Sequence, residues 1–146
     1  MAKKTATAVW QGSLTEGSGV VSSKSGVLNE TPMTWKARSG DNEAAASPEE
    51  LIAAAHATCY AMALSNELSS AGFTPDKLEV TSVVTFGPKP EGGVKIHSSA
   101  LTLTGTVPGI SADKFNEIAN AAKTGCPVSA ALAGNVEITL SASLEK

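Results

Sequence analysis

A nearly continuous run of small and apolar residues from Ser47 to Gly72 constrains the fold of this chain more than any other feature. Ser47 can N-cap a helix, Pro48 suits the first helical position, and Glu50 completes a capping box. Gly72 supplies the C-terminal stop. The segment therefore predicts one long helix. Because apolar side chains occupy most of its faces, we expect a buried central element.

The segments on either side of this helix have the patterns of strands and shorter helices. Strands are predicted at residues 5–10, 19–22, 78–86, 94–107 and 136–144, and helices at 112–123 and 128–132. Residues 28–37 contain Pro32, which favours an edge strand or an extended loop, with Trp35 packing inward. The polar stretch 38–43 then leads to the long helix. Strands, a long helix, a hairpin, helices and a final strand form an α+β order.

The length of the chain bears on its domain organisation and assembly. At 146 residues, the chain is expected to form a single domain, residues 1–146. A helix that is apolar on all sides needs more cover than these short elements supply. We therefore predict a homodimer in which the two long helices are enclosed between sheets from both chains.

The charge and the cysteine content exclude several function classes. The net charge of −3 gives no indication of a nucleic-acid or anionic-membrane partner. No apolar run is long enough to span a bilayer, and no apolar signal segment follows Lys4, so a cytoplasmic protein is expected. Two cysteines without C-x-x-C spacing and two scattered histidines make a poor zinc site. In a reducing compartment such thiols are either inert core groups or redox-active ones.

Cys59, near the middle of the long helix, has two interpretations. It can be a small buried hydrophobe, since free cysteine is among the most buried residue types. A reactive thiolate would instead need a neighbouring cation, because an apolar environment raises the thiol pKa. Arg38, the only arginine in the sequence, is the candidate cation. Its planar fork can hold a thiolate and a carboxylate together.

Cys126 has a stronger local reason to ionise. If Pro127 begins a helix, Cys126 is the N-cap, where free backbone N–H groups and the macrodipole favour an anion. The alternative is a capping residue or a core thiol. Local physics alone thus names Cys126 as the more acidic of the two thiols.

The neighbouring carboxylates Glu49 and Glu50 have different expected roles. Glu50 has the capping-box position, whereas Glu49 has no capping role and is free to pair with Arg38. Ten residues of helix span about 15 Å, so Glu49 cannot touch Cys59 directly. It can act on the thiol only through the arginine or across a subunit boundary.

His56 precedes Cys59 by three residues and shares its helix face, which leaves a thiol–imidazole pair open. Two alternatives to a redox enzyme therefore remain. One is a Cys–His hydrolase that uses Cys59 and His56. The other is a non-enzymatic, stress-induced ligand-binding protein with two structural thiols.

Two motifs resemble the OsmC/Ohr family of thiol-dependent peroxidases. They are SPEELIAAAHATC around Cys59 and GCPVS around Cys126. The stretches SGVLNETP, AGFTP and VPGISADKF are similar to the osmotically inducible protein C branch rather than to the organic hydroperoxide resistance branch. The resemblance covers essentially the whole chain. It implies an intertwined α+β homodimer, with long central helices enclosed by antiparallel sheets and two sites at the subunit interface.

The resemblance also implies a role for each candidate residue, and it reverses the local expectation for the thiols. Cys59 would be the peroxidatic cysteine and Cys126 the resolving one. Glu49 would orient Arg38, and Arg38 would hold the Cys59 thiolate and polarise the peroxide. Attack on the O–O bond would give a sulfenic acid on Cys59, which Cys126 would convert to an intramolecular disulfide.

The resemblance further implies the partners of the reaction. An external dithiol, such as a lipoylated protein, would restore both thiols, with no metal or bound cofactor. An apolar pocket around the site, for which Leu51, Met62 and Phe73 are candidates, would favour organic hydroperoxides over hydrogen peroxide. The expected role is defence against oxidative or osmotic stress.

Overall fold

The computed structural model describes residues 1–40 and 44–145, which divide into two compact units. The first unit ends at Leu51 and the second begins at Ile52. Residues 41–43, the last part of the polar stretch before the long helix, lie outside the described residues.

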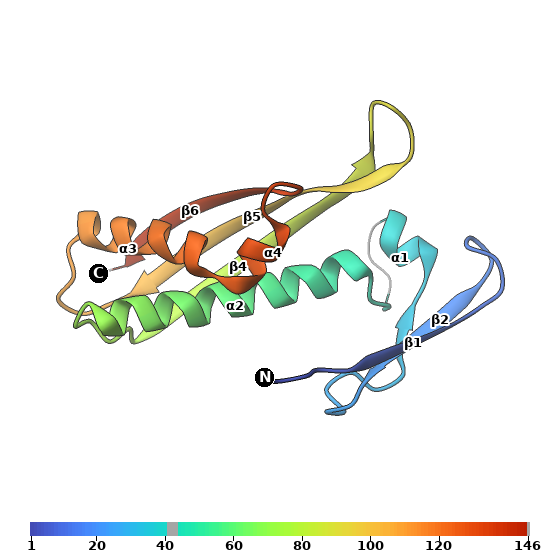
Figure 1. The fold of residues 1–146 in the computed structure, drawn as a ribbon, viewed down its shortest axis with the longest axis horizontal. Helices are drawn as coiled ribbons and strands as arrows, with labels where there is room; N and C mark the ends of the chain where they lie inside the picture. The colour runs from blue at the N-terminus through green and yellow to red at the C-terminus, as the bar shows by residue number, and fades with distance from the viewer. Residues whose placement is uncertain (41–43, 146) are drawn as a thin grey trace. The chain divides into compact units, whose positions relative to one another are not determined.

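The first unit contains a three-stranded antiparallel sheet and a short helix (Figure 1). Its elements are β1 (Ala6–Gln11), β2 (Ser18–Ser23), β3 (Thr31–Met33) and α1 (Trp35–Ser39). Pro32 lies in β3, an edge strand, as predicted. Helix α1 was not predicted; it begins after Thr34, whose hydroxyl accepts the backbone N–H of Ala37 at 3.0 Å. Of the residues in the three strands only Val21 is buried, so this sheet has little core of its own.

The long helix α2 (Pro48–Ser70) has the ends that the sequence predicts. The Ser47 hydroxyl accepts the backbone N–H of Glu50 at 3.2 Å, which caps the first turn. At the other end Gly72 has a φ of +92°, a left-handed conformation that glycine adopts without strain. The backbone N–H of Phe73 then donates to the Leu68 carbonyl at 2.9 Å, which satisfies a terminal carbonyl.

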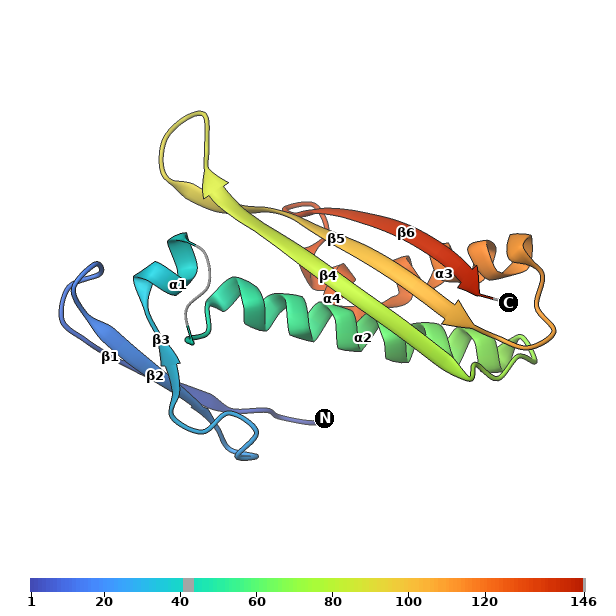
Figure 2. The same cartoon turned by 180° about the vertical axis from the view of Figure 1, so that it is seen from behind.

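The second unit is a two-layer structure in which helices cover one face of a sheet (Figures 1 and 2). Its strands are β4 (Lys77–Pro88), β5 (Val94–Thr106) and β6 (Glu137–Glu145), in the order β4-β5-β6. Its helices are α2 from Ile52 onward, α3 (Ala112–Gly125) and α4 (Pro127–Leu132).

One expectation about the sheets is wrong in part. β4 and β5 form the predicted antiparallel hairpin, but β6 runs parallel to β5. The connection from β5 to β6 contains α3 and α4, and a crossover through helices returns the chain in the same direction. The sheet of the second unit is therefore mixed rather than antiparallel.

The core of the second unit joins one face of α2 to the sheet and to α3. The fully buried large apolar side chains are Tyr60, Leu64, Leu68, Leu101, Leu103 and Phe115. The Tyr60 hydroxyl donates to the Ala119 carbonyl at 2.8 Å, so this buried polar group is satisfied. The opposite face of α2 is exposed in the single chain, with Met62 at 69% exposure. The helix is thus central but not buried on all sides.

Gly105 of β5 is required by the packing of α3 against the sheet. A Cβ atom at this buried position would lie 2.7 Å from Cζ of the Phe115 ring, closer than van der Waals contact allows. We expect Gly105→Ala to lower the free energy of unfolding by about 1–3 kcal/mol, because the rigid ring must shift. Urea denaturation followed by circular dichroism measures this change.

Gly87→Ala is the matched control, because a Cβ there would meet only the His97 ring, at 3.9 Å. We expect this variant to unfold at nearly the same urea concentration as the wild type. Equal stability of the two variants would contradict the close packing of Phe115 on β5.

Candidate functional site

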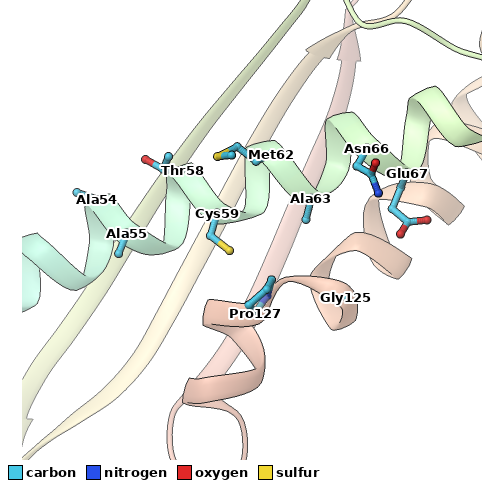
Figure 3. Close-up of a pocket in the computed structure, with 10 residues that line it drawn as sticks. All are labelled: Ala54, Ala55, Thr58, Cys59, Met62, Ala63, Asn66, Glu67, Gly125 and Pro127. Carbon is cyan, nitrogen blue, oxygen red and sulfur yellow. The ribbon is translucent and has the colours of Figure 1, made fainter. Parts of the chain in front are cut away.

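The two cysteines meet where α2 passes the start of α4. Cys59 is half-buried on α2, and Cys126 is wholly buried as the N-cap of α4, as the sequence predicts. Both thiols are free, and they lie close enough for each to shift the pKa of the other. In Figure 3 the Cys59 sulfur points toward Pro127, the first residue of α4. The fold therefore brings together two thiols that are far apart in the sequence.

The surroundings of the two sulfurs shift their pKa values in opposite directions. Burial raises the pKa of Cys59, and the neighbouring Cys126 raises it further, although a hydrogen bond from the backbone N–H of Val128 opposes this. Burial also raises the pKa of Cys126, but hydrogen bonds from Ser129, Cys59 and Val128 outweigh it and lower the pKa overall. Cys126 is thus the more acidic thiol within the pair, which agrees with the expectation from its N-cap position.

Cys59, unlike Cys126, lines an open pocket of about 720 Å³ (Figure 3). Small and apolar residues form most of its wall: Ala54, Ala55, Met62, Ala63, Gly125 and Pro127, with Thr58, Asn66 and Glu67 as the polar part. Of the three residues suggested from the sequence, Met62 is among the residues lining this pocket. Phe73 instead packs against the hydrophobic core, and Leu51 is half-buried outside the pocket wall.

Arg38 and Glu49 form an ion pair within the first unit, as the sequence predicts. Nη2 of Arg38 lies 3.0 Å from Oε1 of Glu49, and Nε lies 3.1 Å from the same oxygen. Glu49 is only 6% exposed, so its carboxylate is held firmly in the first turn of α2. Two donors of one guanidinium on one carboxylate fix the orientation of the arginine side chain.

Arg38 also lines a second pocket, of about 280 Å³, in the first unit. The indole rings of Trp10 and Trp35 form part of its wall, together with Val9, Leu14, Val20 and Met33. The inward packing of Trp35 was expected, whereas Trp10 carried no signal beyond its place in a strand. The arginine is thus set in an apolar environment, where a charge interacts more strongly than it does in water.

His56 is wholly buried, and both of its ring nitrogens contact serine hydroxyls. Nδ1 lies 2.6 Å from Oγ of Ser99, and Nε2 lies 2.8 Å from Oγ of Ser129. Neither nitrogen is directed at Cys59, so the geometry does not favour the Cys–His hydrolase. Sequence reasoning missed both serines. The three-residue spacing from Cys126 to Ser129 was a usable signal, but nothing local indicated Ser99.

Among the described residues, no group of three or more histidine, cysteine or carboxylate side chains is arranged to hold a metal ion. No helix in this part of the chain has the length and apolarity needed to cross a membrane.

Comparisons with known proteins indicate the same family as the sequence motifs. The family model for OsmC-like proteins matches residues 40–141. The chain is 45% identical to peroxiredoxin OsmC of Escherichia coli over 136 residues, 93% of this chain and 92% of that protein. It is 30% identical to organic hydroperoxide resistance protein OhrB of Bacillus subtilis over 122 residues, 84% of this chain and 87% of that one.

The fold of a solved relative is similar as well. The structure superimposes on the crystal structure of an organic hydroperoxide resistance protein from Elizabethkingia anophelis with a TM-score of 0.76 and 30% identity, covering 99% of both chains. The similarity extends over nearly the full length in sequence and in structure. The chain therefore belongs to the OsmC-like family.

Proposed function

We propose that this protein is a thiol-dependent peroxidase that reduces organic hydroperoxides in defence against oxidative or osmotic stress. The observation that carries the proposal is the thiol pair: Cys59 lines an apolar pocket and lies beside the buried Cys126. The names of its relatives, a peroxiredoxin and organic hydroperoxide resistance proteins, support the same reaction class. Two free cysteines fit the cytoplasm, where thiols are kept reduced.

The first half-reaction is assigned to Cys59 because of its access to the pocket. Cys126 is the more acidic thiol but has 0% exposure, so a hydroperoxide in the pocket reaches Cys59 first. The Cys59 thiolate attacks the outer oxygen of the hydroperoxide, an S–O bond forms and the O–O bond breaks. The products are a sulfenic acid on Cys59 and an alcohol, which takes up one proton.

Arg38 is proposed to supply the positive charge that this step needs. Burial raises the pKa of Cys59, so its thiolate at neutral pH requires stabilisation by a cation. Arg38 is oriented by Glu49, and its planar fork of donors can contact a thiolate and a peroxide oxygen together. Its setting among apolar side chains strengthens both interactions.

The second half-reaction joins the two cysteines. The Cys126 thiolate attacks the oxidised sulfur of Cys59, the disulfide forms and hydroxide leaves as water after protonation. An external dithiol, such as that of a lipoylated protein, then reduces this disulfide through a mixed disulfide and is itself oxidised. The apolar pocket favours the organic part of a hydroperoxide over hydrogen peroxide, because its burial adds binding energy.

The proposed active form is an intertwined homodimer. Every residue of β1 is exposed in the single chain, including Val9 and Trp10, and the exposed face of α2 carries Met62. Large apolar surfaces of this kind are typical of protein interfaces. We propose that a second copy covers both surfaces, and that the two units of each chain serve as one domain within this dimer.

The first test is the mass of the intact protein after one equivalent of cumene hydroperoxide. We expect the wild type to lose two hydrogens, with a Cys59–Cys126 disulfide in the peptide map. Cys126→Ser is expected to retain one added oxygen on Cys59 and to consume only about one equivalent of peroxide. An unchanged mass in both proteins would favour the ligand-binding alternative. Oxygen found on Cys126 of the wild type would reverse the two roles.

The role of Arg38 is tested by a change that keeps its charge. We expect Arg38→Lys to lower kcat/KM roughly 10- to 100-fold, because lysine lacks the two-donor fork and a hydrogen bond to a charged group contributes about 1.5–3 kcal/mol. Glu49→Gln is expected to act in the same direction. Glu50→Gln, at the exposed neighbouring carboxylate, is the control and should keep normal turnover. Near-normal turnover of Arg38→Lys would remove Arg38 from the mechanism.

The assembly is tested by analytical ultracentrifugation. We expect the wild type to sediment at twice the chain mass of 14.7 kDa. Met62→Glu should weaken the association at least tenfold, since it places a charge on the exposed apolar face of α2. Asn116→Glu adds the same charge to an exposed position of α3 and should leave the dimer intact. A monomeric wild type at micromolar concentration would contradict the proposal.

A further inference from the structure

A network of polar side chains extends from the sheet of the second unit to Cys126. Ser82 of β4 and Ser99 of β5 have their hydroxyl oxygens 2.9 Å apart. Ser99 contacts Nδ1 of His56 at 2.6 Å, and Nε2 of His56 contacts the Ser129 hydroxyl at 2.8 Å. Ser129 lies in the first turn of α4, three residues after the N-cap Cys126, where its side chain and backbone N–H act as donors that lower the pKa of that thiol. The network therefore ends at the thiol that the proposed reaction uses as the resolving cysteine.

Most side chains of this network are shielded from solvent. His56, Ser99 and Cys126 have 0% exposure and Ser129 has 3%, whereas Ser82 is half-buried. Burying an imidazole costs free energy unless its nitrogens are hydrogen-bonded, and an apolar side chain would fill the same space without that requirement. In the described part of the chain no buried side-chain polar atom lacks a partner. The network is thus complete and has an exit toward the surface at Ser82.

The hydrogen bonds of this network can all donate in one direction or all in the opposite one. Burial lowers the pKa of His56, so its neutral ring donates from one nitrogen and accepts at the other. When Cys126 is a thiolate, its sulfur accepts from the Ser129 hydroxyl, which then accepts from Nε2–H of His56. Nδ1 in turn accepts from the Ser99 hydroxyl.

The opposite direction applies when Cys126 is protonated. The thiol then donates to Ser129, Ser129 donates to Nε2, and Nδ1–H donates to Ser99. Passing from this state to the thiolate moves one proton along each bond, so that one proton leaves Cys126 and one arrives at Ser82. The two ring nitrogens of His56 exchange their roles in that passage.

We propose that His56 is a positioning residue for the resolving half-reaction, which holds Ser129 as a donor to the Cys126 thiolate and conducts the thiol proton toward Ser82. This inference rests on the proposed roles of the two cysteines. In that step the Cys126–H bond breaks, the S–S bond forms and the S–O bond of the sulfenic acid breaks. The thiol proton leaves through the network to solvent at Ser82, and the departing hydroxide takes up one proton from solvent, so that the net products are the disulfide and one water molecule.

The other titratable groups on the elements around His56 are not part of this network. Tyr60, on the same helix, is buried and donates to the Ala119 carbonyl. Among the described residues of the second unit, α4 has no charged side chain. Within that unit the charged side chains of α2, β4 and β5 are all exposed: Glu67, Lys77, Glu79 and Lys95. Glu91 is exposed in the β4–β5 turn. His97 bonds to the Pro88 carbonyl, and Lys89 is half-buried near the β4–β5 turn.

The test separates the two half-reactions by rapid mixing with one equivalent of cumene hydroperoxide. Samples quenched with an alkylating reagent are analysed by mass spectrometry, which gives the rates of Cys59 sulfenic acid formation and of disulfide formation. We expect Ser129→Ala to slow disulfide formation at pH 7 at least tenfold and to move its pH profile to higher pH, because the thiolate loses a donor. Sulfenic acid formation should change less than threefold.

Variants of His56 show whether the histidine acts through Ser129. His56→Gln keeps an amide nitrogen where Nε2 lies, so we expect it to retain a faster disulfide step than His56→Leu. Ser99→Ala, which removes the partner of Nδ1, should also slow disulfide formation. Ser98→Ala, at the neighbouring position of β5, is its matched control and should match the wild type. If His56→Leu does not fold, Ser129→Ala and His56→Gln decide the question.

Two results would overturn the inference and leave the proposed function standing. One is disulfide formation at the wild-type rate and pH profile in Ser129→Ala and His56→Gln. The other is an equal slowing of both half-reactions, which a merely structural role would produce. A wild type that forms no Cys59–Cys126 disulfide would instead overturn the proposed function itself.

Discussion

The burial of one face of α2 against the sheet is the interaction on which the second unit depends. Tyr60, Leu64 and Leu68 recur every four residues and form the buried stripe of the helix. Met62 lies on the opposite, exposed side. Cys59 is at the border between the two sides, where it packs against the core and also lines the pocket. The thiol therefore belongs both to the packed core and to the wall of the pocket.

One of the two thiols is the more acidic, and the other is the more accessible to substrate. The backbone at the start of α4 donates to both sulfurs, but Cys126 receives more donors and holds the thiolate more readily. Cys59 is the less acidic thiol, but it has the better access to substrate. A cation is therefore needed for the first step and a properly directed donor for the second, so the two steps place different demands on the surrounding side chains.

Local features of the site could be predicted from the sequence, whereas contacts between distant segments could not. The helix caps, the N-cap position of Cys126 and the pairing of Glu49 with Arg38 depend on residues close in sequence or on the only arginine. The parallel pairing of β6 follows from where the connecting helices pack. The contact of His56 with Ser99 joins residues 43 positions apart and depends on the register of β5 against α2. No periodicity encodes such a contact.

The buried face of α2 thus carries both the apolar contacts that hold the helix and one polar contact that reaches Cys126. His56 precedes Cys59 by three residues, yet it bonds to serines on β5 and α4 rather than to the nearby thiol. A displacement of the helix along its axis would break these bonds and alter the setting of Cys59 at once. The same packing that stabilises the unit therefore fixes the geometry of both thiols, which links the stability of α2 to the chemistry of the pair.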